Sequence, residues 1–529
     1  MKPSLLQRLA QAGRAIGGGF GQWQIAIIFA LFWGAYLWFS PAVVPDVWAG
    51  LLQNGADDPL FPYLAGFSVL AASYFAAWLA LGRAENKYLV LTVIFCLALA
   101  PRLWVITLGW YQPCYDFLRY FQFGQHFASG DFKWIADQVE QYVLSMPTMG
   151  GVAVFFGVLC KLFGTSLFGV QLAGALLSSG ICVLIAVLIW NYGQKTATLA
   201  ALLYAVYPGS IISTAIVTNH HGAVFLFMLA LWCCRKYMSA GPFKKRAACA
   251  FFCGALLCAS NLVHPSVVVV LAAIYLFTVI VVCENGWRER KLFSRANGAI
   301  ASCFLIAVLT YAVLMPTGVS ALKKFGLINT ERGTTLLFKF VFGLNQYSKG
   351  RYFGPDVKYL RSFSYDEQPK IALDMIKERL EDPEEVRDLL LYKDWHAFFS
   401  PDEYFVWFYA WQEEKCIDDA KQGLDDTKDR AEYSYLEDLM TKAGLLDQLW
   451  LRIIYLLAVL GALLKPKLHK ADLLVALMYI SMGWALVIML TEEQSRYRYP
   501  AMPTFFMLAA MGLAGCWKIA SAAVGRKVK

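Results

Sequence analysis

A single carboxylate, Asp116, follows a long apolar stretch and lies among aromatic and polar residues. Keeping an acid ionised close to hydrocarbon costs free energy, so such a residue is a candidate for function. A carboxylate within hydrogen-bond reach of an acceptor hydroxyl can take its proton as a general base. Arg119 lies three residues later. The alternative is that Asp116 only stabilises the start of a helix and pairs with that arginine.

Two arginines, Arg496 and Arg498, precede the last apolar run of the chain. Pro500 disfavours helical geometry in the residue before it, so we predict an extended segment in which both arginines project to one side. Two guanidiniums at a membrane boundary suit a phosphate group, since each can bond to it bidentately. The alternative is that they pair with Glu492 and Glu493 or anchor the last helix among lipid head groups.

Three histidines lie at the ends of apolar runs: His220 and His221 follow Asn219, and His264 precedes Pro265. Adjacent histidines point apart, and no carboxylate follows at ligand spacing, so the pattern gives little support to a zinc site. Contact with a sugar or phosphate and simple capping of the loops both stay open. The sequence leaves the presence of a metal unknown.

Two further polar features accompany these residues. The glycine-bounded stretch from Gly343 to Gly350 contains Asn345 and Lys349 and reads either as a turn or as a substrate contact. Arg102, in the outer third of an apolar run, either extends its charged end to the interface or contacts a phosphate.

The elements that position these residues are apolar helices. Of the 529 residues, 58% are hydrophobic and 16% are charged, against about 25% charged in soluble domains. The net charge of +9 comes from basic residues in short loops between apolar runs, which indicates orientation in a membrane and argues against nucleic-acid binding. The first run, near 24–44, is too long for a cleaved signal, so we interpret it as a retained span.

The run at 150–163 decides the topology. As a helix it covers about 21 Å, less than a hydrocarbon core of about 30 Å. If it does not cross, every basic loop lies on one side with both termini, whereas crossing would move the basic cluster 235–246 outside, against the usual bias. We therefore predict an all-α polytopic membrane protein of about twelve helices (eleven to thirteen), with 150–163 re-entrant or interfacial. Both termini are then cytoplasmic, and Asp116 is extracytoplasmic.

This topology predicts four regions. They are two extra transmembrane helices in 1–85, a transmembrane module in 86–315 with a catalytic loop at 108–165, an extracytoplasmic domain in 316–448, and C-terminal transmembrane helices in 449–529. Acidic residues outnumber basic ones in 316–448, and its pattern near 370–392 predicts helices. Apolar residues between Trp134 and Met146 recur at helical spacing, which predicts a helix lying in the interface plane.

Taken in order, these features resemble those of the GT-C superfamily of membrane glycosyltransferases, in the branch with the protein O-mannosyltransferases and the aminoarabinose transferases. The residues that carry the resemblance are Pro101-Arg102-Leu103, Asp116 with Tyr120 and Gly130, Met146-Pro147, Lys161 to Gly164, Tyr207-Pro208, Gly343 to Gly350, and Arg496 to Pro500. The resemblance runs from about residue 90 to the end. Relatives often carry an acidic pair where this chain has Asp116 between Tyr115 and Phe117.

The resemblance implies an inverting transfer from a polyprenyl-phosphate sugar to an acceptor hydroxyl of a glycan, lipid or protein, on the extracytoplasmic face of a bacterial inner membrane. Asp116 would be the base. The donor phosphate would be bound by Arg102, Arg119, Arg496 and Arg498. Substrate contacts would come from His220, His221, His264, Asn345, Lys349, Glu492 and Glu493. No cofactor is required by the sequence, and a divalent cation stays an open possibility.

Other classes of protein could present the same residues. A transporter or flippase for a lipid-linked or anionic substrate would use the arginines as a transport site. Transporters commonly contain internal repeats, and we can align none in this sequence. A non-catalytic scaffold with a partner-binding outer domain is a third possibility.

Overall fold

The computed structural model describes residues 61–141, 148–239, 241–265, 267–289, 294–329, 337–411, 427–464 and 473–527. All regular secondary structure in these ranges is helical. The predicted span near 24–44 lies outside the described residues.

Seven helices in the described ranges are long and apolar enough to cross a membrane. They are α5 (Lys87–Thr107), α9 (Leu167–Ile189) with η2 (Trp190–Tyr192), α13 (Phe243–Val263), α14 (Val267–Glu289), α15 (Arg295–Lys324), α21 (Thr427–Leu463), and η3 (Ser495–Ala501) continued by α23 (Met502–Lys527). The apolar helices α4 (Phe61–Leu81), α8 (Thr148–Phe163), α12 (His220–Met238) and α22 (Leu473–Leu490) accompany them. The protein is therefore a helical membrane protein, and the total of about twelve spans stays a prediction.

The apolar run 197–212 predicts a single span, and as one helix this prediction is wrong. The structure divides it into α10 (Gln194–Ala205) and α11 (Pro208–Ile212). Tyr207 is extended, with φ −65° and ψ 116°, because a proline disfavours helical geometry in the residue before it. Pro208 then takes the first position of α11, where its missing N–H costs nothing.

Two helices continue through the predicted domain boundaries. α15 contains Pro316 and ends at Lys324, beyond the boundary expected at 315. α21 begins at Thr427 and runs without a break into the apolar stretch expected to start at 449. The changes of polarity from which these two boundaries were inferred therefore fall inside continuous helices.

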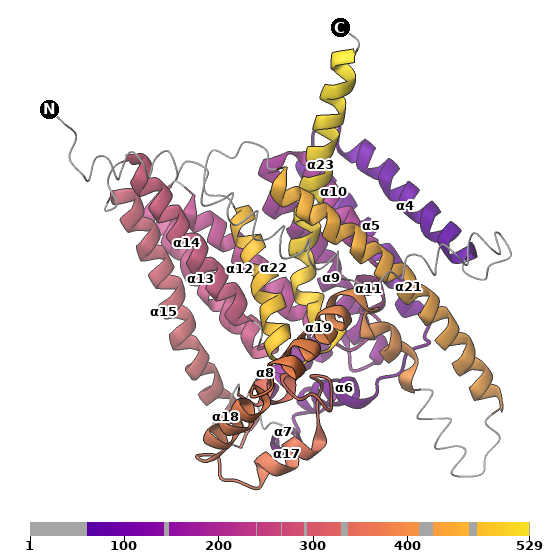
Figure 1. Ribbon diagram of the computed structural model, residues 1–529, viewed down its shortest axis with the longest axis vertical. Coiled ribbons are helices and arrows are strands. Elements are labelled where there is room, and N and C mark those ends of the chain that lie inside the picture. Colours follow the sequence, from indigo (N-terminus) through magenta and orange to yellow (C-terminus); the bar gives the residue numbers. More distant parts are fainter. Residues whose placement is uncertain are drawn as a thin grey trace.

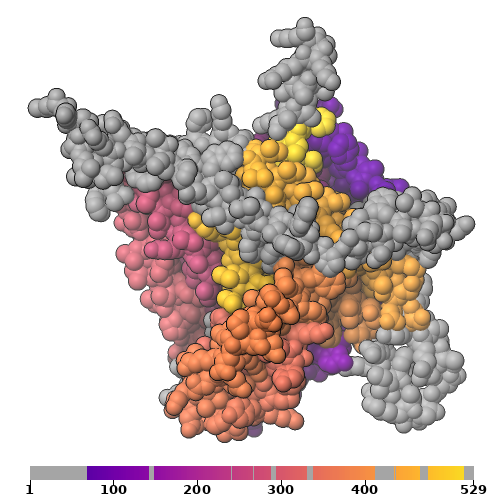
Figure 2. Space-filling view, viewed as in Figure 1, coloured from indigo at the N-terminus to yellow at the C-terminus, as the bar shows by residue number. Residues whose placement is uncertain are grey.

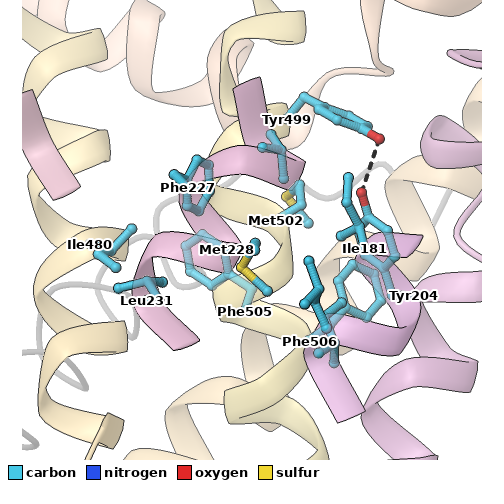
Figure 3. Close-up of a cluster of buried hydrophobic side chains, with 14 of the residues drawn as sticks. Ile181, Tyr204, Phe227, Met228, Leu231, Ile480, Tyr499, Met502, Phe505 and Phe506 are labelled. Atoms are coloured by element: carbon cyan, nitrogen blue, oxygen red, sulfur yellow. Dashed lines mark hydrogen bonds between the residues drawn. The ribbon is translucent and has the colours of Figure 1, made fainter. Parts of the chain in front are cut away.

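The centre of the bundle is formed by α9, α10, α12, α22 and α23. Figure 3 shows its side chains, with Met228 from α12 close to Phe505 from α23, and Phe506 beside Tyr204 from α10. The hydroxyl of Tyr204 donates to that of Tyr499 over 3.0 Å within this apolar cluster. The bond satisfies polar atoms that would otherwise be costly to bury.

Glycines allow α21 and α23 to approach closely. A Cβ at Gly461 would lie 2.0 Å from the carbonyl oxygen of Leu508, and one at Gly512 would lie 2.0 Å from that of Leu457. Only a residue without a side chain fits at these two positions. Small residues at such crossings are the usual means of packing membrane helices together.

A group of shorter helices lies at the end of the bundle opposite the C-terminus (Figure 1). These are α6 (Tyr115–Ser129), α7 (Phe132–Gln141), α16 (Leu337–Gly343), α17 (Gly354–Arg361), α18 (Gln368–Arg379) and α19 (Pro383–Phe399), together with a helical segment at 403–411. α16, α17 and α18 share a small core that includes Phe338, Leu360 and Ala372. The prediction of a mostly helical segment before the C-terminal spans agrees with these bounds.

The helix predicted after Trp134 is present as α7, but its environment differs from the expectation. Ile135, Ala136 and Val139 are buried, and α7 packs against α6 and α8. The apolar side of α7 therefore faces protein, whereas the sequence predicts that this side faces lipid at the interface. α8 packs against α6, α9 and α13, and the prediction that 150–163 does not cross the membrane stays a prediction.

Candidate active site

Asp116 lies in the first turn of α6. Tyr115, the first residue of the helix, has a φ of 47°, an uncommon conformation for a residue with a side chain. The position places the carboxylate near the unpaired N–H groups of the helix start, which favour negative charge. Its Oδ2 atom lies 3.7 Å from Nη2 of Arg496, and the side chain is 42% exposed. A substrate can therefore reach this carboxylate.

Arg496 is held by charges and aromatic rings from two segments, α6 and 403–411. Besides Asp116, Glu403 approaches it, with Oε2 3.9 Å from Nε. The guanidinium carbon lies 5.1 Å from the ring of Phe117 and 5.5 Å from that of Trp407. Burying a guanidinium is costly unless carboxylates and ring faces replace water. The arrangement holds a positive charge in one place beside Asp116.

A second cation, Lys339 of α16, lies on another side of the same site. It forms an ion pair with Glu492, whose side chain is buried. The ring of Tyr497 lies 5.9 Å from the Lys339 nitrogen and 5.7 Å from the guanidinium carbon of Arg496. The two cations thus share one aromatic neighbour, although Lys339 and Arg496 are far apart in sequence.

Two of the three histidines adjoin these charges. Nδ1 of His220 lies 2.5 Å from the hydroxyl of Tyr404, and Nε2 of His220 lies 3.1 Å from Nε2 of His264. Burial, with the nearby Lys339 and Arg496, lowers the pKa of His264 to about 3. His264 is therefore neutral at physiological pH, and one imidazole of the pair donates to the other.

His221 belongs to the core of the bundle. Its Nε2 lies 3.0 Å from the carbonyl oxygen of Ser213, and its Nδ1 lies 2.9 Å from the hydroxyl of Tyr499. Adjacent helical residues point in different directions, so His220 faces the candidate site and His221 does not.

The expected extended geometry before α23 is wrong. Residues Ser495–Ala501 form a 3-10 helix, η3, in which residues two apart point to different sides. Arg496 faces Asp116, whereas Arg498 is fully buried and donates to Asp447 at 3.1 Å and to the carbonyl of Ser400 at 2.8 Å. Arg498 thus supports the backbone that carries the site, and we leave it out of the candidate phosphate site.

Arg102 is also occupied within the protein. It is fully buried. Its Nε donates to Ser178 of α9 at 2.8 Å, and its Nη2 donates to Ser210 of α11 at 2.7 Å. It neither extends to the interface nor faces Asp116. Its hydrogen bonds join three helices of the bundle.

Two of the remaining candidates, Asn345 and Lys349, have partners in other parts of the protein. Asn345 is buried and donates to Asp356 at 2.8 Å. Lys349 is exposed and lies 4.9 Å from the ring of Tyr392. These two residues shape the turn after α16. Arg119, half-buried, lies on α6 one turn after Asp116.

Glu493 is buried next to the site without facing Arg496. Its Oε1 lies 2.7 Å from Nδ1 of His396, and its Oε2 lies 3.7 Å from Nε of Arg351. Its backbone N–H donates to the carbonyl of Gly350 at 2.8 Å. Of the two predicted glutamates, Glu492 pairs with Lys339 of the site. Glu493 connects the segment before η3 to α19 through His396.

Sequence reasoning missed Lys339, Glu403, Tyr404 and Trp407. Lys339 is the one charged residue among the seven of α16. A cation in a short apolar helix needs a partner, so the sequence contained a signal for this residue. Glu403 and Trp407 are four residues apart in the helical segment 403–411, so they share a face.

Within the described ranges, no three His, Cys, Asp or Glu side chains are grouped so that they could hold a metal ion. The site described here is composed of two cations, three carboxylates, two imidazoles and several aromatic rings. Such a set can bind an anion and accept a proton.

Comparisons with known proteins give little further information. No protein-family profile matches the chain, and no curated protein matches it. One solved structure with some likeness is that of ArnT from Cupriavidus metallidurans bound to undecaprenyl phosphate. The two chains are 14% identical, the match covers 83% of this chain and 80% of that one, and the TM-score is 0.32. The likeness is too distant to establish a shared fold or function.

Proposed function

We propose that this chain is a membrane glycosyltransferase that moves a sugar from a polyprenyl-phosphate donor to an acceptor hydroxyl on the extracytoplasmic face. The observation that carries the proposal is the approach of Asp116 and Arg496 to 3.7 Å, a potential base beside a fixed cation. The order of motifs along the sequence, which resembles that of GT-C enzymes, supports the donor class.

In the proposed reaction, the acceptor oxygen attacks the anomeric carbon of the sugar and its proton passes to Asp116. A new carbon–oxygen bond forms as the bond from the anomeric carbon to the phosphate oxygen breaks. Polyprenyl phosphate leaves with that electron pair. The configuration at the anomeric carbon is inverted, because attack occurs in line with the leaving group.

The cations act where negative charge grows. Arg496 and Lys339 flank Tyr497, and they would contact the phosphate as it accepts the electron pair. Fixed charges of this kind lower the barrier most when they need no rearrangement. The rings of Phe117 and Trp407 hold Arg496 in place for that purpose.

His220 and His264 would contact the sugar. His220 is buried and His264 is half-buried, and Tyr404 orients His220 through its Nδ1. Neutral imidazoles can donate and accept hydrogen bonds without adding charge beside the cations. The scaffold interpretation explains neither the exposed acid nor the paired cations.

The proposal is tested by the lipids that co-purify with the full-length protein, identified by mass spectrometry. We expect Asp116→Asn to retain polyprenyl phosphate carrying its sugar, because binding survives and transfer stops. Arg496→Gln should lose about tenfold of the bound donor, the size of one charge-assisted contact. Arg83→Gln, an exposed arginine outside the site, is the matched control and should behave as the parent.

Two results would overturn the proposal. One is an Asp116→Asn variant that transfers sugar at the parental rate. The other is a parent protein that carries no polyprenyl phosphate and instead moves a soluble anion across vesicles, which would favour a transporter.

A further inference from the structure

A cavity of about 550 Å³ lies where α19 meets the end of α22, apart from the candidate active site. Its apolar lining consists of Leu380, Pro383, Val386, Leu390, Leu391 and Met489. The volume is within the range of about 300–1,000 Å³ that small ligands occupy. In Figure 1, α19 crosses the lower end of α22, and the two helices are in contact.

One oxygen of a carboxyl group that lines the cavity has no hydrogen-bond partner among the described residues. Asp394 is one of its lining residues, and its Oδ1 is buried without a hydrogen bond from any described residue. Burial raises the pKa of Asp394 to about 8, so the group is mostly protonated at neutral pH. A neutral carboxyl can donate a hydrogen bond to a carbonyl oxygen inside an apolar site. An unsatisfied buried polar group calls for such a ligand.

The cavity continues an apolar surface that faces outward from the bundle. Leu486, Val487 and Leu490 of α22 are exposed, and Leu391 of α19 is 55% exposed beside them. Figure 2 shows the orange surface of α19 adjoining that of α22 on one face of the molecule. Exposed apolar residues on an apolar helix of a membrane protein suit contact with lipid chains, which places the mouth of the cavity toward the lipid.

One cation lies at the edge of this cavity. Arg387 is a lining residue, it is exposed, and it pairs with Asp388 over 2.9 Å. It is seven residues before Asp394, which places both side chains on one face of α19. A guanidinium outside an apolar groove matches a phosphate group above an acyl chain.

From this arrangement we propose that the cavity between α19 and α22 is a binding site for a membrane phospholipid. One acyl chain lies in the groove past Leu391 and Met489, Arg387 contacts the phosphate, and Asp394 donates to the ester carbonyl. The site fastens the outer helices to the membrane surface. It is independent of the proposed transfer reaction, so each proposal can fail alone.

The test uses the full-length protein in vesicles of phosphatidylethanolamine and phosphatidylglycerol, with a trace of phosphatidylglycerol bearing a diazirine on an acyl chain, close to its ester carbonyl. After illumination, peptide mapping should find the adduct on Asp394 and near Met489. Leu391→Asp, which places a charge at the mouth of the groove, should reduce that adduct about tenfold. Leu373→Asp is the matched control, an exposed leucine of α18 outside the cavity, and should leave it unchanged.

A second probe, diacylglycerol with the same diazirine, examines the phosphate contact. The phospholipid should label the groove about threefold more than diacylglycerol does, the size of an exposed ionic contact. Arg387→Gln should remove that difference, and Lys377→Gln on α18 should keep it. Equal labelling by both probes in the parent, or an adduct that Leu391→Asp does not reduce, would overturn the proposal.

Discussion

Arg496 depends on its shape as well as its charge. The planar guanidinium lies near the rings of Phe117 and Trp407 while its nitrogens face Asp116 and Glu403. A lysine ammonium keeps the charge but has no planar face to stack on the rings and lacks the bidentate fork of a guanidinium.

We therefore expect Arg496→Lys to bind the polyprenyl-phosphate donor about threefold more weakly, a loss of roughly 0.7 kcal/mol and less than that of Arg496→Gln. The measurement is the amount of donor retained through purification, compared with added donor at rising concentration. Trp407→Phe preserves a ring face and should retain most of the binding. Parental binding by Arg496→Lys would show that charge alone is enough.

Lys339 and Glu492 allow structural and functional effects to be separated. Lys339→Met leaves the buried Glu492 unpaired, which should destabilise the protein by about 3 kcal/mol. Adding Glu492→Gln removes the unpaired charge and should restore most of that stability. Donor binding should stay low in the double variant, because the cation is still missing. Thermal unfolding and donor retention measure the two effects, and recovery of both together would assign Lys339 a structural role only.

Local signals in the sequence pointed to several residues that the structure brings together, and the roles of these residues stay predictions. Asp116, Arg496 and Glu492 stood out because charges beside apolar runs are costly. Arg102 and Arg498 gave the same signal, but their partners, such as Ser178 and Asp447, come from distant segments. Sequence patterns show that a buried charge needs a partner and do not show which one it has.

At the scale of elements, Lys393 of α19 joins two helix ends. Its buried ammonium donates to the carbonyl oxygens of Gly343 at 2.8 Å, Met489 at 2.6 Å and Thr491 at 2.7 Å. These carbonyls end α16 and α22, where no intrahelical donor remains. Lys393→Met should destabilise this junction by about 1–3 kcal/mol, the penalty for buried acceptors left unsatisfied.

Hydrogen–deuterium exchange of Leu337–Gly343 measures that junction directly. Exchange in α16 should become faster in Lys393→Met, because the helix loses its attachment to α22. Lys370→Met, at an exposed position of α18, controls for the loss of a charge. Unchanged exchange in α16 would show that packing alone holds the helix there.

The stability of the helical segment 403–411 depends on pH through Asp402. The carboxylate of Asp402 accepts a hydrogen bond from the backbone N–H of Tyr404. Burial raises the pKa of Asp402 to about 7, with Arg498 opposing and Asp447 adding to the shift. The folded protein thus holds a proton that the unfolded chain releases near its ordinary pKa of about 3.9. The contribution of Asp402 to stability is complete below about pH 4 and is lost as the pH rises to about 7.

Asp402→Asn should weaken this dependence while keeping the hydrogen bond to Tyr404, because an amide oxygen also accepts. The measurement is the unfolding temperature in detergent between about pH 5 and pH 8. Between these values the parent should lose more stability than the variant. Asp388→Asn, at an exposed carboxylate, should follow the parent, and identical slopes for all three proteins would contradict the assignment.

Elements were predicted best where periodicity is long. Apolar runs at 86–107, 166–190, 248–263 and 266–283 predict four spans, and α5, α9, α13 and α14 lie close to these ranges. The break between α10 and α11 could have been foreseen from Pro208. The 3-10 geometry of η3 could not, because Ser495–Ala501 is fixed by contacts with α19 and α22.

For the whole molecule, charge is the main guide to orientation. The helices α16 to α19 gather at the end of the bundle opposite the C-terminus (Figure 1). The predicted topology makes that end extracytoplasmic, because basic loops collect at the other end. The outer location of the candidate active site rests on this charge bias. The location matters for function because a lipid-linked donor can be used only from the face to which the site opens.

Cysteine labelling tests that orientation in whole cells. Tyr347, in the turn after α16, is 92% exposed, and Asn191, at the end of α9, is exposed at the other end of the bundle. A membrane-impermeant maleimide should modify Tyr347→Cys in intact cells and Asn191→Cys only after permeabilisation, each measured above the signal of the parent and its native cysteines. Both substitutions replace exposed side chains, so neither should disturb folding. The reverse pattern would place Asp116 and Arg496 on the cytoplasmic face and would remove the physical basis for an extracytoplasmic transfer.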